Sequence, residues 1–93
     1  MATLVFVEVS DGKVRKTSLE ALAYAHQMGS GVTAIVMGTV SASELETLGK
    51  YGAQKVLHVA DARLDHPAIQ AYATVLTKAM QDENADVLVL ANS

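Results

Sequence analysis

Apolar and polar residues alternate along the chain in blocks that suit strands and helices in turn. Short, nearly continuous apolar runs, typical of strands covered on both faces, occupy Thr3–Val9, Val32–Met37, Lys55–Ala60 and Val87–Leu90. Longer segments with apolar residues at helical spacing lie between them. The pattern therefore predicts four β-strands that alternate with three α-helices.

Capping and turn residues place the ends of the predicted helices. Thr17–Glu20 and Ser41–Glu44 have the spacing of a capping box, in which a hydroxyl and a carboxylate satisfy free backbone donors at a helix start. Gly29 and Gly52 suit the left-handed conformation that often ends a helix. Pro67 suits the first turn of the third helix, because its missing N–H would have no partner there.

The expected buried faces of the helices follow from apolar residues at intervals of three and four. The first helix, which should end near Met28, carries Leu19, Leu22, Ala23 and His26 on one face. The second helix runs through Leu45 and Leu48. The third carries a stripe of Ile69, Tyr72, Ala73, Leu76 and Met80 and ends in the polar residues Asp82, Glu83 and Asn84.

This order of elements predicts a doubly wound, three-layer α/β domain. Strand–helix–strand crossovers are right-handed and give a parallel sheet. We expect the strand order 3-2-1-4, with the first two helices on one face and the third on the other. The 93 residues have room for one domain. The last strand is followed only by Ala91, Asn92 and Ser93, so we expect an incomplete sheet whose edge a further βα segment or a partner covers.

Composition narrows the classes of partner. A chain that is 51% hydrophobic and 18% charged forms a packed core, and its net charge of −3 repels polyanions. Lys13, Arg15 and Lys16 are too few for a phosphate patch, so nucleic acid is not expected. The absence of cysteine excludes disulfides and thiolate chemistry. Without a signal peptide or a membrane-length apolar run, the protein is expected in the cytoplasm, with no direct membrane insertion.

Four loops lie where open α/β sheets bind ligands, at the carboxyl ends of the strands. They are Ser10–Lys13, Gly38–Ser41, Asp61–His66 and Asn92–Ser93. The first presents a carboxylate where a nucleotide phosphate would sit, and the second is explained by helix capping. Turn chemistry therefore accounts for both loops better than ligand binding does.

A glycine pattern at Gly29–Ala34 resembles a dinucleotide-binding fingerprint, but its context is reversed. These glycines follow a predicted helix and precede a predicted strand, so their amides cannot form the helix N-terminus that holds a pyrophosphate. We interpret the pattern as a helix cap and a tight turn. A nucleophile elbow and a P-loop lysine motif are both absent.

The remaining polar and aromatic residues form no catalytic set. Asp61 and Asp65 lack a companion carboxylate for acid–base work. No metal-ligand spacing relates His26, His58 and His66, and we expect His26 at the boundary between helix and sheet. Core or boundary positions are expected for Tyr24, Tyr51 and Tyr72. The prediction is therefore a scaffold or binding domain with no catalytic, cofactor-binding or metal-ligating residue.

Several blocks of sequence, in order over nearly all 93 residues, carry a family resemblance. They are Leu4–Glu8, Asp11–Lys16, Ser18–Leu22, Val32–Gly38, Leu48–Val56 and Ala85–Val87. Together they resemble the opening of electron-transfer flavoprotein alpha subunits, close to the forms in which Lys50-Tyr51-Gly52 precedes Lys55–Val59. The resemblance implies that residues 1–93 are the N-terminal α/β domain of such a subunit. The fold would be Rossmann-like, of the adenine nucleotide alpha hydrolase-like type.

The resemblance implies a component of an electron carrier and not a self-contained enzyme. Members of the family pair an alpha with a beta subunit and hold FAD. They carry electrons from dehydrogenases, such as the acyl-CoA dehydrogenases of fatty acid β-oxidation, toward a membrane quinone oxidoreductase. Most flavin-binding residues lie in a later C-terminal domain, and the AMP site belongs to the beta subunit. The family therefore assigns no cofactor residue to this chain and implies a bacterial scaffold and subunit-interface domain.

Two other functions remain open at this point. One is a free-standing adenine-nucleotide-binding module of the same fold, for which tight binding of ATP or AMP would be diagnostic. The other is a small assembly domain without a ligand, which would capture a partner subunit and show no nucleotide effect on its melting temperature.

Overall fold

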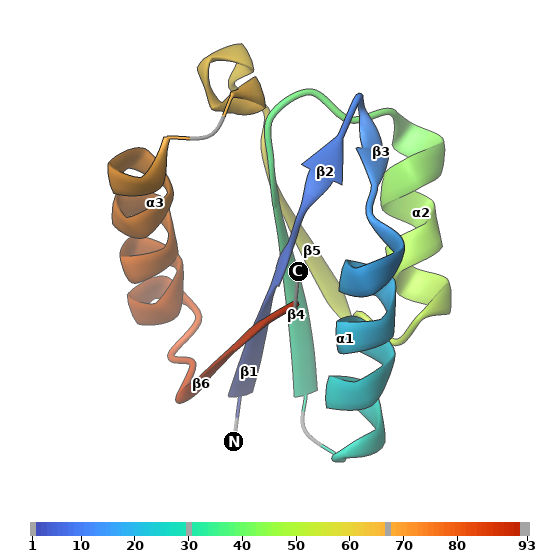
Figure 1. Ribbon diagram of the computed structural model, residues 1–93. Helices are drawn as coiled ribbons and strands as arrows, with labels where there is room; N and C mark the ends of the chain where they lie inside the picture. Colours follow the sequence, from blue (N-terminus) through green and yellow to red (C-terminus); the bar gives the residue numbers. More distant parts are fainter. Residues whose placement is uncertain (1, 30, 67, 92–93) are drawn as a thin grey trace.

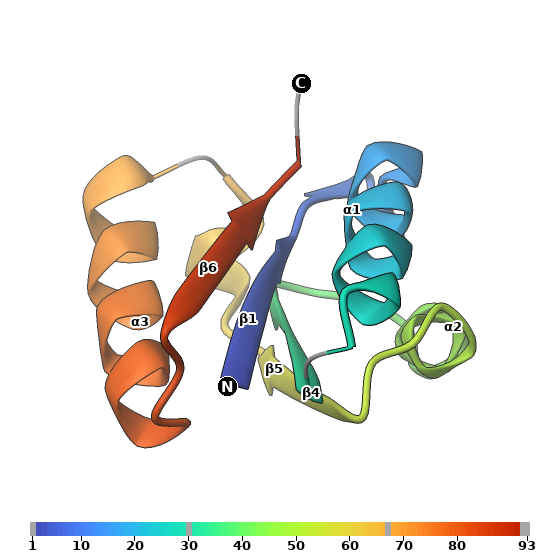
Figure 2. The same ribbon diagram turned by 90° about the horizontal axis from the view of Figure 1, so that it is seen from below.

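A computed structural model describes residues 2–29, 31–66 and 68–91. Its elements are β1 (Ala2–Val7), β2 (Val9–Ser10), β3 (Lys13–Val14), α1 (Lys16–Gln27), β4 (Gly31–Met37), α2 (Ala42–Lys50), β5 (Lys55–Val59), the 3-10 helix η1 (Ala62–Asp65), α3 (Ile69–Asp82) and β6 (Val87–Leu90). The main sheet lies between α1 and α2 on one side and α3 on the other (Figures 1 and 2). The three-layer prediction is confirmed.

The main sheet has four strands in the order β5-β4-β1-β6, and every neighbouring pair is parallel. When the four main strands are counted along the chain, this is the predicted order 3-2-1-4. Val5 of the central strand β1 aligns with Ala34 of β4 and with Val89 of β6. The pairing is parallel because each crossover contains a helix that carries the chain back to the same end of the sheet.

One core cluster fills the space between the sheet and helices α1 and α2. Its members are each at most 1% exposed: Val5, Val7, Leu22, Ala25, Val32, Ala34, Val36 and Leu48. The sheet contributes to it through alternate residues, because successive strand side chains point to opposite faces.

A second cluster lies between the sheet and α3. It consists of Leu4, Ile35, Met37, Leu64 and Ala79. On the edge strand β6, Val89 packs against the first cluster, so Leu88 and Leu90 point to the α3 side, where both are exposed. The α3 face is therefore less completely covered than the α1–α2 face.

The first strand ends earlier than predicted. β1 stops at Val7, and β2 then pairs antiparallel with β3 in a small hairpin. Asp11 and Gly12 form its two-residue loop with φ angles of 53° and 76°. An Asp-Gly pair between β-forming residues is a strong signal for such a turn, because both positions need positive φ. The prediction of one strand from Thr3 to Val9 was therefore wrong at its carboxyl end.

The capping box predicted at Thr17 does not form. Helix α1 begins at Lys16, and its N-cap residue Arg15 makes no side-chain cap bond. The Oγ1 atom of Thr17 is buried without a hydrogen-bond partner among the described residues. The neighbouring Ser18 hydroxyl instead accepts a hydrogen bond from the backbone N–H of Glu8 at 2.8 Å. The hairpin places the strand end against this helix, so a tertiary contact replaces the expected local one.

The capping box predicted at Ser41 is half formed. The Ser41 hydroxyl accepts a hydrogen bond from the Glu44 backbone N–H at 3.4 Å. The Glu44 carboxylate does not complete the box but accepts from the Val14 N–H of the hairpin at 2.7 Å. The helix-ending glycines are confirmed, with φ of 81° at Gly29 and 114° at Gly52.

The buried face of α3 differs from the predicted stripe. Ile69, the first helical residue, is 83% exposed, and Ala73 is also exposed. The face that contacts the core carries Tyr72, Val75, Leu76, Ala79 and Met80. Ala73 lies at one side of this face and is exposed. Pro67 lies outside the described residues, and the predicted loop at Asp61–Asp65 contains η1.

Three predicted boundary residues lie at the surface. Tyr24 and Tyr51 are exposed, because α1 turns Leu22 and Ala25 toward the sheet and Tyr51 caps the end of α2. His26 is exposed as well and lies over Gly52, where an added Cβ would be 2.5 Å from the Cβ of His26. Of the tyrosines, Tyr72 alone has the predicted half-buried position.

Candidate functional site

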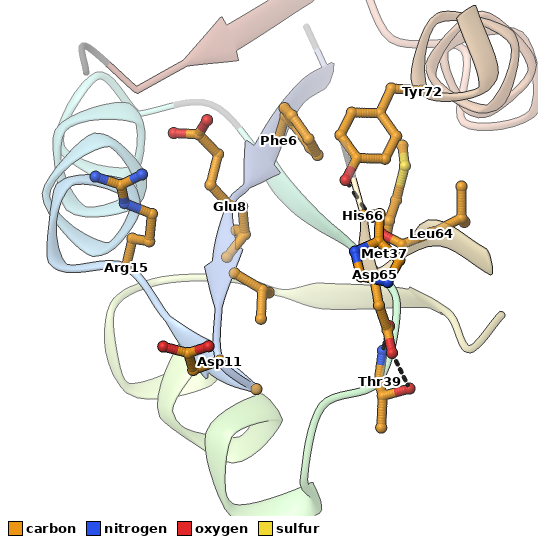
Figure 3. A pocket seen from close by; sticks show the side chains of 13 residues that line it. Phe6, Glu8, Asp11, Arg15, Met37, Thr39, Leu64, Asp65, His66 and Tyr72 are labelled. Carbon is orange, nitrogen blue, oxygen red and sulfur yellow. Dashed lines mark hydrogen bonds between the residues drawn. The ribbon is translucent and has the colours of Figure 1, made fainter. Parts of the chain in front are cut away.

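A pocket of about 640 Å³ lies at the carboxyl ends of β1 and β4 (Figure 3). Residues from three of the four predicted loops line it, namely Ser10–Lys13, Gly38–Ser41 and Asp61–His66. Glu8 at the end of β1 and Tyr72 of α3 complete the wall. Asn92 and Ser93 of the fourth loop lie outside the described residues. The location agrees with the rule that ligands of open α/β sheets bind at the carboxyl ends of strands.

An apolar wall forms the α3 side of the pocket. The rings of Phe6 and Tyr72 meet edge to face, with centroids 5.6 Å apart and an interplanar angle of 66°. The Tyr72 hydroxyl donates a hydrogen bond to the Leu64 carbonyl at 3.1 Å, which ties α3 to η1. Met37 lies beside them (Figure 3). This wall presents aromatic and aliphatic surface to any ligand body.

Asp65 anchors η1 to the end of β4. Its carboxylate accepts hydrogen bonds from the Thr39 backbone N–H at 2.7 Å and from the Thr39 hydroxyl at 3.0 Å. The approach depends on Gly38, which has φ of 98° and whose added Cβ would lie 2.7 Å from Asp65 Oδ1. A carboxylate of the chain itself thus occupies the strand-end donors that could have held an external anion.

His58 has a structural contact near this anchor. Its Nε2 atom lies 2.7 Å from the Gly38 carbonyl oxygen. Because a carbonyl can only accept, Nε2 is the protonated nitrogen and donates. The contact ties β5 to the loop after β4. His66 lines the pocket, whereas His26 is remote from it, so the structure does not bring the three histidines together.

The pocket carries more negative than positive charge. Glu8 and Asp11 line it on the same side as Arg15, and Asp65 lines the opposite side (Figure 3). The Oε2 atom of Glu8 is buried and has no hydrogen-bond partner among the described residues. A phosphate placed here would meet carboxylates at close range, which disfavours nucleotide anions.

Asp61 and Arg63 form a closed turn at the start of η1. The Asp61 carboxylate accepts from the Arg63 backbone N–H at 2.9 Å and pairs with the Arg63 Nη2 at 2.7 Å. The hydrogen bonds from the Arg63 side chain and backbone lower the pKa of Asp61 from 3.8 to about 2. The same side-chain contact raises the pKa of Arg63. An exposed carboxylate held ionised in this way is suited to shaping a turn and not to proton transfer.

The described residues contain neither a cluster of metal ligands nor a helix of membrane-spanning length. Across residues 2–29, 31–66 and 68–91, no group of three His, Asp or Glu side chains is arranged to hold a metal ion. Within the same ranges, no helix has the length and apolarity needed to cross a bilayer. The expectation of no catalytic or cofactor-binding residue stays a prediction.

Sequence reasoning missed the residues that shape the pocket between the loops. Phe6, Glu8 and Met37 lie at the carboxyl ends of buried strands, and Tyr72 reaches them from α3. Glu8 is the first charged residue after the apolar run of β1, a position that could have marked it as a candidate. The contribution of Tyr72 depends on how α3 crosses the sheet and has no local signal.

Sequence comparison with known proteins identifies the family to which the chain belongs. The model of the electron transfer flavoprotein domain matches residues 3–93. Electron transfer flavoprotein subunit alpha of Syntrophomonas wolfei is 41% identical over 59 residues, which are 63% of this chain and 19% of that protein. The alpha subunit of Clostridium acetobutylicum is 30% identical over 90 residues, which are 92% of the chain and 27% of the relative. The alpha subunit of Bacillus subtilis is 29% identical over 92 residues, which are 97% of the chain and 28% of the relative.

The chain thus spans only 19–28% of the length of these relatives. The match to the family model, over residues 3–93, extends over the hairpin, the three helices and all four strands of the main sheet. It agrees with the resemblance seen in the sequence blocks. On this evidence, the chain belongs to the electron transfer flavoprotein domain family.

Proposed function

We propose that residues 1–93 are the N-terminal α/β domain of an electron transfer flavoprotein alpha subunit and act as a scaffold and subunit interface. The match of the family domain over residues 3–93, together with the alpha-subunit relatives, carries this proposal. The domain is one component of an electron carrier, and the redox chemistry belongs to a flavin held elsewhere in the parent protein.

In this role the parent protein pairs with a beta subunit and holds FAD. It accepts electrons from dehydrogenases, such as acyl-CoA dehydrogenases, and passes them to a quinone oxidoreductase from the cytoplasm. The charge of the pocket supports placing FAD outside this domain, because Glu8, Asp11 and Asp65 would repel the flavin's diphosphate. The domain then contributes support and docking surface.

The edge strand β6 is the surface we assign to the rest of the complex. Leu90 is 60% exposed and Leu88 36%. Both point to the α3 side of the sheet, at an edge that α3 leaves uncovered. Exposed apolar edges of this kind are normally shielded, because their free N–H and C=O groups pair readily with another strand. A further βα segment of a longer alpha chain, or the beta subunit, would cover it.

Flavin uptake tests the scaffold role. The 93-residue chain, mixed with FAD and desalted, should show no visible flavin absorption, whereas the longer gene product purified with its beta subunit should be yellow. Stoichiometric flavin bound by the 93 residues alone would contradict the proposal.

The β6 surface can be tested separately. Leu90→Ser in the complete alpha subunit should weaken co-purification of the beta subunit or expose the flavin domain to proteolysis. Tyr24→Ser, at an exposed position on α1, should change neither. If both variants co-purify the beta subunit equally well and resist proteolysis equally, the assignment of β6 to the interface is wrong.

A free-standing nucleotide module is the second candidate, because the pocket lies where this fold class holds nucleotides. Titration of the chain with AMP in a calorimeter separates the two functions. Micromolar AMP binding by the isolated chain would favour the module, and its absence is expected for the scaffold.

A further inference from the structure

The loop of the β2–β3 hairpin is a turn whose reactive groups are exposed. Asp11 and Gly12 both face solvent, and the Asp11 carboxylate lies at the tip of the hairpin (Figure 3). Within the residues that the structure describes, no hydrogen bond or ion pair engages this carboxylate, and the Gly12 backbone N–H makes no hydrogen bond. A Cβ added at Gly12 would meet only the Thr39 carbonyl oxygen, at 4.0 Å. A free carboxyl group therefore adjoins a free and unshielded backbone amide.

This pair of groups can react by ring closure. The Gly12 nitrogen attacks Cγ of Asp11, and a new N–Cγ bond forms while the carboxyl hydroxyl and the amide proton leave together as water. Glycine favours the step, because it has no side chain to hinder the approach of its nitrogen. Water then adds to the cyclic imide. When it breaks the bond between the Gly12 nitrogen and the main-chain carbonyl carbon of Asp11, the chain continues through Cγ as isoaspartate.

We propose that Asp11 is a site of spontaneous isomerisation to isoaspartate, whose free α-carboxylate is the group that isoaspartyl methyltransferases esterify. Ring closure requires the Asp11 backbone to rotate out of its φ of 53°. The hairpin ladder that opposes this rotation has two residue pairs, Val9 with Val14 and Ser10 with Lys13. So short a hairpin is marginal by itself, and its loop can open locally without unfolding the main sheet.

The other aspartates of the chain lack this combination of features. None of them precedes a glycine. Three have carboxylates that accept hydrogen bonds or pair with a cation, namely Asp61, Asp65 and Asp82. The fourth, Asp86, precedes Val87, whose branched side chain crowds the nitrogen and which belongs to strand β6. The folded chain should therefore isomerise at Asp11 and not at these positions.

Isomerisation should also loosen the hairpin. Isoaspartate places one more carbon atom in the main chain of a two-residue loop, and loop length fixes the register of a hairpin. The pairing of Ser10 with Lys13 is then lost. The Val14 N–H, which donates to the Glu44 carboxylate at 2.7 Å, is the next contact along the chain. Its exchange with deuterium should be faster in the isomerised chain than in the parent.

Peptide mapping of the aged protein tests the proposal. The folded 93-residue chain, incubated in mildly acidic buffer and then digested, should give a second Asp11 peptide of unchanged mass that accepts a methyl group from an isoaspartyl methyltransferase. The other aspartate peptides should show no such isomer. The rate at Asp11 should lie within about tenfold of the rate in guanidinium chloride, because opening the loop costs little. Isomerisation of Asp11 in the unfolded chain alone, or an isomer that accepts no methyl group, would overturn the proposal.

Two variants at the same position test the ring closure. Asp11→Gly, which suits a positive-φ turn, should give no isomer and should leave the exchange of the Val14 N–H as in the parent. Asp11→Asn should lose ammonia through the same ring, and its rate should rise with pH. The parent rate should fall as pH rises, because the hydroxyl leaves only from the protonated carboxyl group. The same pH trend in both proteins would exclude this reaction. None of these measurements involves flavin or the beta subunit, so their outcome is independent of the carrier role.

Discussion

The two faces of the sheet are closed to different degrees. On the α1–α2 face every cluster residue is at most 1% exposed, whereas Leu64 and Ala79 of the α3 cluster are each 7% exposed. The α3 side also contains the pocket wall and the exposed Leu90. Helices α1 and α2 cover the first face, and α3 covers the second (Figure 2). The α1–α2 face is therefore the more completely packed core, while the α3 face keeps exposed apolar surface.

The largest expected effect is a difference in unfolding free energy between truncations in the two core clusters, one on each face of the sheet. Leu22→Ala, in the closed cluster, should lower the free energy of unfolding by about 3–4 kcal/mol, because it leaves a cavity that its fully buried neighbours cannot fill. Leu64→Ala, beside the pocket, should cost about 2 kcal/mol, at the lower end for such changes, because the site is partly open. Urea unfolding of both variants measures this difference. A larger loss at Leu64 would contradict the contrast between the faces.

Two glycine substitutions test the contact between Asp65 and Thr39 at the pocket. Gly38→Ala should cost about 2–3 kcal/mol, because it strains a positive-φ residue and pushes Asp65 away from Thr39. Gly49→Ala, in helix α2 with open space around the added Cβ, should instead stabilise by about 0.5–1 kcal/mol. Thermal unfolding distinguishes the two signs. A neutral Gly38→Ala would show that the Asp65 contact contributes nothing to the open face.

A smaller effect is expected at the junction of α3 and η1. Tyr72→Phe removes the hydroxyl that donates to the Leu64 carbonyl and should cost about 1 kcal/mol. Tyr24→Phe, at an exposed position, should stay within about 0.5 kcal/mol of the parent. The same urea experiment measures both changes, and equal values would mean that this hydrogen bond does not hold α3 in place.

The smallest expected effect is a loss of folding stability at low pH, through Asp61. Since folding lowers the pKa of Asp61 from 3.8 to about 2, its ionised form favours the folded turn. This contribution is complete above pH 3.8 and is lost as the pH falls through about 2. An NMR titration of the Asp61 carboxyl should show the lowered pKa, and Arg63→Gln should return it toward the ordinary value. An unchanged pKa in that variant would exclude the Arg63 side chain as the cause, because the backbone N–H of residue 63 is retained.

The candidate site was partly accessible to sequence reasoning. Three of the four loops predicted at the carboxyl strand ends do meet around the pocket, because parallel strands bring their ends to one edge of the sheet. The aromatic wall was not predicted, since the crossing of α3 decides where Tyr72 lies. The assignment of the Thr17 capping box also failed, because Ser18 found the Glu8 N–H as a partner across ten residues of sequence.

The sequence by itself determined the four main strands, the three helices, their parallel order, the glycine helix ends and the family resemblance. The strands, helices and helix ends follow from local patterns of apolar residues, caps and turns, which act within a few residues of the chain. The parallel order follows from the alternation of strands and helices, because strand–helix–strand crossovers are right-handed. Only the tertiary structure decided that Glu44 reaches Val14 and that Asp65 holds Thr39. A polar side chain bonds to the donor nearest in space, and linear spacing identifies that donor only when it is also near in sequence.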